Sequence, residues 1–524
     1  KKALESLPEA ARAELMAATF VFEASPAEAK PIEVQMGCSG SKVRPEPTTP
    51  TGKPPFIQDL ESPSLAEVNE RHSVKDPAGS VDAEALTLRL LSSLKADGER
   101  AALPVIAHAE RRPSGRRGLS RAALRGLRTF FEQHGALDKV MGDVCKAPGL
   151  AVSVCELTKS TGLSLAESLV LAAEAAGEDE RSLVGQATVS EATSFFSYSW
   201  TGTKLRDMLD AVERALSNLE ADGRARFVWI DMFCASQPLL AGLFRDPAIT
   251  KESDPEGYLA RKEDTDRIFD DAIDAVGEIL FYMEPLAGAW AAPPHPFLLA
   301  EQGEPAAGWV RHGPAALTRA WCIFELAKAL AKKCTLHVLL SPESVGLFED
   351  KLRHDGGGWK WVGELLGGID VKLAQISKVE DREYILGEVG KLEGGMGAIN
   401  STVMGALRGW MATEGKAMLG AMPSAERGTS TLLSNVANML ENGGRLDEGA
   451  ELKREYLAAR RSQYGPRHPN TLVALGSLAV NLFNQRKYAE AEPLFRESLE
   501  ASREVSGNDD EHTQIDVGNL GEVL

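Results

Sequence analysis

Five positions in the middle of the chain carry side chains that could bind a ligand or act in catalysis: Ser199, Trp200, Asp231 and Trp321 as ligand residues and Glu325 as a catalytic one. Ser199 and Trp200 follow a short aromatic run, and Asp231 ends the next apolar run. Glu325 lies in a segment that reads Trp-Cys-Ile-Phe-Glu-Leu from Trp321 onward. A carboxylate held in a low-dielectric site stabilises positive charge that develops during a reaction. These residue types indicate a ligand site, although Asp231 also suits a helix cap or a salt bridge.

Short apolar runs that alternate with amphipathic segments must position these side chains. The alternation of strand and helix is typical of a parallel sheet covered on both faces. Ligand sites in such sheets form at the carboxyl ends of the strands, where the polar residues named above fall. The sequence predicts strands at 195–200, 227–231, 278–283, 335–340 and near 369–371, with helices at about 204–219, 266–276 and 318–332.

Two of these segments resemble a known family. Phe-Phe-Ser-Tyr-Ser at 195–199 resembles the opening strand of Toll/interleukin-receptor (TIR) domains, and residues 321–326 resemble their W-C-x-x-E-L helix. The resemblance covers about residues 190–380 and implies a flavodoxin-like fold. In the TIR domains that cleave NAD, the glutamate of this helix is catalytic, which implies that role for Glu325 and NAD as the substrate. A carboxylate there would stabilise the oxocarbenium-like ribose as neutral nicotinamide leaves.

The chain departs from the TIR pattern, and its candidate residues also have structural explanations. Residues 229–237 are not typical of the family, and the insertion at 238–267 replaces a short loop. Trp321 suits helix packing, and Glu325 could face solvent. Sequence signatures of phosphate loops, dinucleotide loops, zinc proteases and serine hydrolases are absent, and the nine histidines show no ligand spacing. The sequence therefore predicts no metal site and leaves enzymatic activity open.

A period of 42 residues runs through the C-terminal region, where Thr429, Thr471 and Thr513 share one position of the repeat. Each unit predicts two amphipathic helices, such as 470–484 and 488–505. Gly-Pro-Arg-His-Pro-Asn-Thr from 465 and Tyr-Ala-Glu-Ala-Glu-Pro-Leu from 488 resemble tetratricopeptide repeats of the kinesin light chain type.

This resemblance implies a solenoid whose concave surface binds a peptide or protein partner. The alternative is a purely structural spacer. Because such stacks need about three units, we expect further repeats beyond Leu524. The candidate partner-binding residues are Asn435, Asn438, Asn481 and Lys487.

The N-terminal region contains a candidate acylation signal. Residues 1–80 are predicted to be largely disordered, because proline, serine, threonine and charge dominate from Pro31 onward. If translation begins at Met36, the sequence that follows predicts myristoylation of Gly37 and palmitoylation of Cys38. Two acyl chains would attach the protein stably to a membrane, whereas the upstream residues would block the signal.

Composition limits the classes of function. The net charge of −18 argues against a generic nucleic-acid binder. Six scattered cysteines without a C-x-x-C pair indicate a reducing compartment, so we expect a cytoplasmic protein, membrane-associated only if acylated. The predicted parts are the disordered segment, an all-α region at 81–185, a TIR-like α/β domain at 186–385, a helical connector at 386–425 and repeats at 426–524.

These parts predict a multidomain protein that combines a flavodoxin-like α/β domain with an all-α solenoid. The first functional hypothesis is an intracellular scaffold or signalling adaptor. Its repeats select a protein partner, and its TIR-like domain self-associates or gives the output. The alternatives are an NAD-cleaving hydrolase that uses Glu325 and a kinesin light chain-like cargo adaptor. The lack of a long heptad coiled coil counts against the cargo adaptor.

Overall fold

The structure is a computed structural model of the 524-residue chain. The residues it describes are 83–100, 116–146, 150, 152–158, 163–176, 187–200, 202–240, 268–286, 289–291, 310–312, 314–367, 369–372, 374–376, 379–392 and 394–524. The predicted disorder of 1–80, the acylation residues Gly37 and Cys38 and most of the insertion at 238–267 lie outside these residues.

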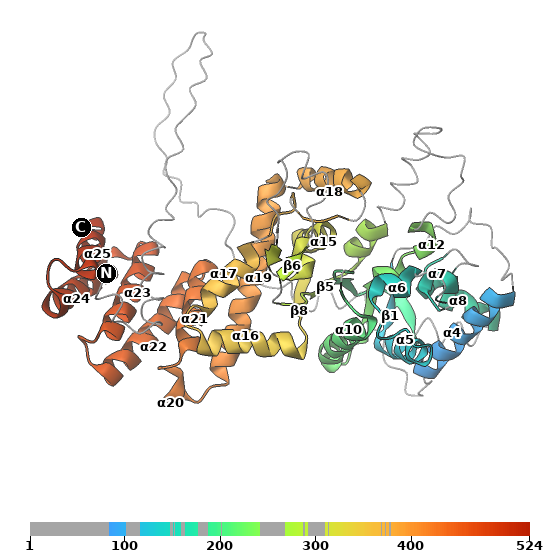
Figure 1. Ribbon diagram of the computed structural model, residues 1–524, viewed down its shortest axis with the longest axis horizontal. Coiled ribbons are helices and arrows are strands. Elements are labelled where there is room, and N and C mark those ends of the chain that lie inside the picture. The colour runs from blue at the N-terminus through green and yellow to red at the C-terminus, as the bar shows by residue number, and fades with distance from the viewer. Residues whose placement is uncertain are drawn as a thin grey trace, which may run out of the picture.

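A six-stranded mixed sheet forms the centre of the α/β part, in the order β2-β1-β4-β3-β5-β8 (Figure 1). The strands β4, β3, β5 and β8 are parallel, whereas β1 is antiparallel to β2 and to β4. The parallel core has the strand order expected of a flavodoxin-like sheet. The bounds are β1 Arg117–Ser120, β2 Val189–Glu191, β3 Ser194–Ser197, β4 Phe227–Ile230, β5 Glu278–Tyr282 and β8 Thr335–Leu339, with a separate pair β6 Ala289–Ala291 and β7 Val310–His312.

Helices cover both faces of this sheet. The neighbouring residues Phe195 and Phe196 of β3 are both 1% exposed. Since successive side chains of a strand point to opposite faces, both faces must be covered. On one of these faces the ring of Phe195 stacks on Trp229 at 4.9 Å. The helices of this part are α4 Ala83–Arg100, α5 Arg121–Gln133, α6 Met141–Lys146, α7 Val154–Thr158, α8 Leu165–Ala176, α10 Leu205–Leu219, α11 Asp231–Cys234, α12 Gln237–Leu240 and α15 Ala320–Ala331, with residues 268–275 also helical.

Two predictions about this part were wrong. The region 81–185 is not all-α, because it contributes β1 to the sheet. Gly118 allows this pairing, since a Cβ at that position would lie 2.8 Å from the backbone carbon of Phe227. The predicted fifth strand near 369–371 does not form, although Ile369 and Val371 are buried. The backbone N–H of Val371 instead donates to the side chain of Asn400 at 3.1 Å.

The C-terminal part is a stack of helices in which each contacts the next along the chain (Figure 1). The predicted helices at 470–484 and 488–505 are confirmed as α23 and α24. Their buried faces carry leucine and small residues, such as Leu475, Ala479 and Ala491. The bounds are α21 Thr431–Asn442, α22 Leu446–Tyr464, α23 Pro469–Asn484, α24 Tyr488–Ser506 and α25 Glu511–Val523.

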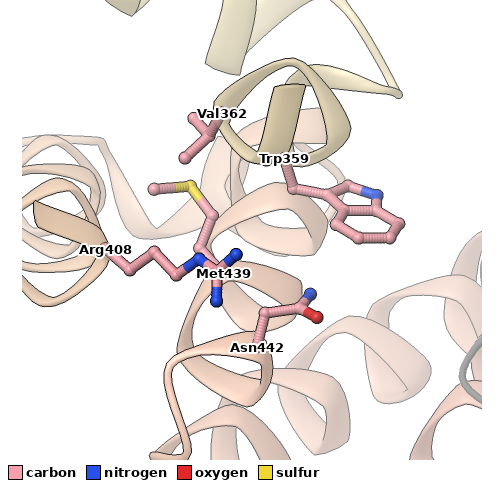
Figure 2. A pocket seen from close by; sticks show the side chains of 6 residues that line it. Trp359, Val362, Arg408, Met439 and Asn442 are labelled. Carbon is pink, nitrogen blue, oxygen red and sulfur yellow. The ribbon is translucent and has the colours of Figure 1, made fainter. Parts of the chain in front are cut away.

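Five helices of the described chain connect the sheet to this stack. The 26-residue helix α19 packs against α15 on the sheet side and against α21 on the repeat side. Both α16 and α17 also contact α21, and a cavity lies where α17, α19 and α21 meet (Figure 2). The connecting helices are α16 Pro342–His354, α17 Gly358–Gly367, α18 Val379–Lys391, α19 Gly395–Gly420 and α20 Ser424–Arg427.

Candidate functional site

Asp231 organises the carboxyl ends of β3 and β4. Its carboxylate accepts a hydrogen bond from the hydroxyl of Tyr198 at 2.7 Å and one from the indole N–H of Trp200 at 2.8 Å. The backbone N–H of Met232 donates to the same carboxylate at 2.6 Å. Burial raises the pKa of Asp231 to about 6, against the opposing effect of these donors. The residue therefore holds the loop after β3 and is mostly ionised at neutral pH.

Glu325 lies inside the protein, on the face of α15 that meets β3. It is 7% exposed, and its carboxyl accepts a hydrogen bond from the hydroxyl of Ser197 at 2.6 Å. The alternative that Glu325 faces solvent is wrong, because α15 packs on the sheet and on α18 and α19. The pKa of Glu325 is raised to about 8, chiefly by burial and in part by the charge of Asp231, while the hydrogen bond from Ser197 opposes the shift. Glu325 therefore holds a proton at neutral pH.

The two carboxyl groups thus differ in charge at neutral pH. Asp231 is the ionised member, and Glu325 is the protonated one. Carboxyl groups whose environments separate their pKa values are the pattern of an acid and base pair. A protonated Glu325 supplies no negative charge to a developing cation.

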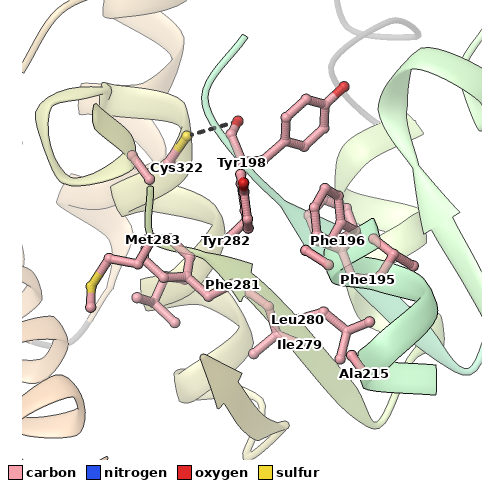
Figure 3. Packing of buried hydrophobic residues seen from close by; sticks show 14 of the residues in the cluster. Phe195, Phe196, Tyr198, Ala215, Ile279, Leu280, Phe281, Tyr282, Met283 and Cys322 are labelled. Atoms are coloured by element: carbon pink, nitrogen blue, oxygen red, sulfur yellow. Dashed lines mark hydrogen bonds between the residues drawn. The ribbon is translucent and has the colours of Figure 1, made fainter. Parts of the chain in front are cut away.

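Buried thiols near these carboxyls act as hydrogen-bond donors. Cys322 Sγ donates to the backbone carbonyl of Tyr198 at 3.3 Å (Figure 3). Burial raises the pKa of the Cys322 thiol far above its usual range, so the thiolate needed for nucleophilic attack does not form. Cys322 itself is buried.

The structure brings three of the predicted ligand residues together and separates a fourth. Ser199 is buried beside Trp200 and Asp231, and its carbonyl accepts from Thr203 Oγ1 at 2.6 Å. Trp321 instead donates its indole N–H to Asp381 of α18 at 3.1 Å. Its ring packs against Phe269 and Tyr384. Trp321 is therefore a packing residue of α15 and α18.

Ser197 and Tyr198 were missed as site residues. Both lie in the aromatic run at 195–199, which was interpreted as strand alone. The signal that could have identified them is the position of hydroxyl side chains in the last residues of a buried strand. Within the described part of the chain, no group of three or more histidine, cysteine, aspartate or glutamate residues is arranged to hold a metal ion.

In the repeats, Asn435 binds the backbone of the chain itself. Its side-chain amide donates to the carbonyls of Leu352 at 2.9 Å and Asp355 at 2.7 Å, and its oxygen accepts from the N–H of Trp359 at 3.3 Å. The side chain is fully buried. It therefore joins α21 to the turn between α16 and α17, and its amide is occupied by this chain.

The other predicted partner-binding residues differ in exposure. Asn481 is fully buried, and its oxygen accepts from Gln485 at 2.6 Å. Asn438 is half-buried on α21. Lys487 is 40% exposed and pairs with Asp447 at 2.6 Å. Only Asn438 and Lys487 thus remain accessible to a partner.

The comparisons with known proteins agree with the repeat. Residues 428–511 match the tetratricopeptide repeat family. The match spans α21 to α24 and the first residue of α25, and it confirms the repeat predicted from the period of 42. No curated protein matches this chain. None of the described helices has the length and apolar character needed to span a membrane.

Proposed function

We propose that the protein is a scaffold that binds a protein or peptide partner through its tetratricopeptide repeats. The observation that carries this proposal is the match over residues 428–511, together with the continuous stack of α21 to α25. Tetratricopeptide solenoids present an extended surface to protein partners. The resemblance to the kinesin light chain type adds the expectation of an extended peptide as the ligand.

Accessible amides on the first helix of each repeat unit support peptide recognition. Asn442 and Asn484 lie one period of 42 apart, at the ends of α21 and α23, and both are exposed. One N–H of each amide donates within the chain, to the carbonyl of Asn438 at 2.8 Å and to Glu441 at 3.4 Å, and the second N–H is available to a peptide. Side-chain amides donate and accept hydrogen bonds, so they recognise the backbone of an extended peptide without requiring one sequence. These positions continue the surface on which Asn438 lies.

The test is the binding of fluorescein-labelled decapeptide pools to the full chain, followed by fluorescence polarisation. Substituting Asn438→Arg and Asn484→Arg together should weaken binding of the pools at least tenfold, because two long cationic side chains would occupy the surface. The matched control is Glu500→Arg, an exposed position on α24, which should leave retention unchanged. Failure of the wild-type chain to retain any pool would refute the proposal.

The α/β domain is proposed to provide self-association or output, as its TIR-like segments imply. The proposal is supported by the parallel strand order and by the burial of the residues that carry the resemblance. Light scattering of the full chain over a concentration series tests self-association. A mass that stays monomeric at every concentration, with and without a bound peptide pool, would remove this part of the proposal. Cytoplasmic location and membrane attachment through acylation of Gly37 and Cys38 belong to the same proposal.

A second candidate function is cleavage of NAD at Glu325. It is favoured by the burial of Glu325 beside Ser197 and by the nearby charge of Asp231. The protonated state of Glu325 at neutral pH counts against electrostatic catalysis until a bound substrate cation lowers its pKa. Nicotinamide release by the full chain, compared with the near-isosteric Glu325→Gln, tests it. Equal nicotinamide release by the wild-type chain and by Glu325→Gln would exclude this role. Release by neither protein, when both are folded and assembled, would exclude it as well.

A further inference from the structure

A cavity of about 70 Å³ lies where α17 meets the start of the repeats (Figure 2). It has room for a few water molecules or for the end of one short side chain. Residues from three helices that are distant in sequence form its walls. The lining residues are Trp359, Val362 and Gly363 of α17, Arg408 of α19, and Met439 and Asn442 of α21.

Arg408 gives the cavity a positive charge that nothing in the described part of the chain neutralises. No carboxylate lines the cavity, and no hydrogen bond or ion pair joins the Arg408 guanidinium to a described residue. Nearby cations behave differently, since Lys416 of the same helix pairs with Glu448, and Arg427 pairs with Glu455 at 3.0 Å. The protein has a net charge of −18, so a cation without a partner is unusual in it. An unpaired arginine beside a cavity can bind an anion through charge-assisted hydrogen bonds.

A further donor and an apolar wall define the shape of that anion. The exposed Asn442 supplies an amide, one N–H of which donates to the backbone carbonyl of Asn438 at 2.8 Å, while the indole nitrogen of Trp359 is turned away from Arg408 (Figure 2). Lys360 lies over the Trp359 ring at 5.7 Å and adds positive charge to this region. Val362 and Met439 provide apolar contact. An arginine fork with an amide beside it fits a carboxylate on a short methylene stem.

We propose that this cavity binds the carboxylate of an aspartate or glutamate side chain in the peptide partner of the repeats. This inference rests on the proposed function, because Asn442 belongs both to the cavity and to the accessible amides of the solenoid. A peptide lying along Asn484 and Asn442 would reach the cavity at its end. A phosphate group is less suited, since a single arginine lines the cavity and a dianion needs more positive charge.

The experiment compares three decapeptide pools on the full chain by fluorescence polarisation. One pool has glutamate fixed at its central position, one has glutamine, and one has phosphoserine, with all other positions randomised. The wild-type chain should bind the glutamate pool about tenfold more tightly than the glutamine pool, which corresponds to about 1.4 kcal/mol. Arg408→Gln should remove this preference, Arg408→Lys should retain part of it, and the exposed Arg503→Gln on α24 should leave it unchanged.

The outcomes separate this inference from the proposed function. If the wild-type chain binds the glutamate and glutamine pools equally, the repeats bind peptides but the carboxylate site is refuted. If a preference for glutamate survives Arg408→Gln, the site lies elsewhere. A preference for phosphoserine would overturn the assignment of a carboxylate. Binding of no pool would overturn the proposed function itself. Circular dichroism of each variant confirms that Arg408 is replaced in a folded chain.

Discussion

Replacing Asn435 with alanine tests whether one buried amide fastens the repeats to the α/β part. The variant removes three hydrogen bonds, two to the backbone carbonyls of Leu352 and Asp355 and one from the N–H of Trp359, although the Asp355 carbonyl keeps the backbone N–H of Gly358 at 2.9 Å as a partner. Each net hydrogen bond contributes about 1 kcal/mol, and a buried group left unsatisfied costs about 1–3 kcal/mol. All three hydrogen bonds break when this turn opens. We therefore expect the free energy of local opening to fall by about 3 kcal/mol, about 1 kcal/mol for each hydrogen bond.

Hydrogen exchange of the peptide that spans residues 352–361 measures this loss. A change of 3 kcal/mol corresponds to about a hundredfold faster exchange of the protected amides in this segment. Asn438→Ala is the matched control, because Asn438 lies on the same helix and its backbone carbonyl, which the substitution keeps, accepts the hydrogen bond from the side-chain amide of Asn442 at 2.8 Å. That variant should change exchange less than threefold.

A second variant reaches the same contact from the other side. A Cβ on Gly358 would lie 2.4 Å from the carbonyl oxygen of Lys351 and 3.0 Å from the amide nitrogen of Asn435. Gly358→Ala should therefore also speed exchange in this segment, and the double variant with Asn435→Ala should be less than additive. Exchange that stays at the wild-type rate in Asn435→Ala would refute the reasoning.

Three further predictions concern stability. Because folding raises the pKa of Glu325 from 4.5 to about 8, the folded state binds the proton more tightly, so stability falls as pH rises across that range. Glu325→Gln should remove this dependence of the unfolding free energy on pH, which amounts to up to about 1.4 kcal/mol per pH unit. Urea unfolding of both proteins at pH 5 and pH 8 measures it, and an unchanged dependence in the variant would contradict the prediction. Lys453→Met breaks a buried pair with Glu441 and should cost about 3–5 kcal/mol in urea unfolding, whereas the exposed Lys487→Met should cost under about 0.5 kcal/mol; equal costs would contradict the burial argument. Gly118→Ala should cost at least about 1–3 kcal/mol in thermal melting, because its Cβ meets the backbone of β4; the helical control Gly142→Ala has open space and should be neutral or stabilising.

The sequence predicted the parallel strands and the repeat helices because each has a strong local signal. Four short apolar runs became β3, β4, β5 and β8, and the period of 42 located α23 and α24. The antiparallel strand β1 could not be predicted, because it is four residues long and depends on the absence of a side chain at Gly118. Its pairing is a tertiary contact that no local pattern reveals.

The candidate site was predicted in part for a similar reason. Asp231 and Trp200 follow adjacent strands, so the rule that places sites at carboxyl ends brought them together. Trp321 follows the same motif but turns to α18, and periodicity gives no indication of that neighbour. The burial of Glu325 depends on the packing of α15 against β3, which the residues of α15 alone do not specify.

The long helix α19 has a consequence for any assembly built from this chain. Since α19 packs on α15 at one side and on α21 at the other, the sheet and the first repeat share one continuous core. No freely jointed tether separates them in the described chain from 394 to 524. A multivalent ligand that gathers several copies would therefore set the mutual orientation of their sheets as well as their number. The ligand would then determine the handedness of such an array and the spacing between its sheets.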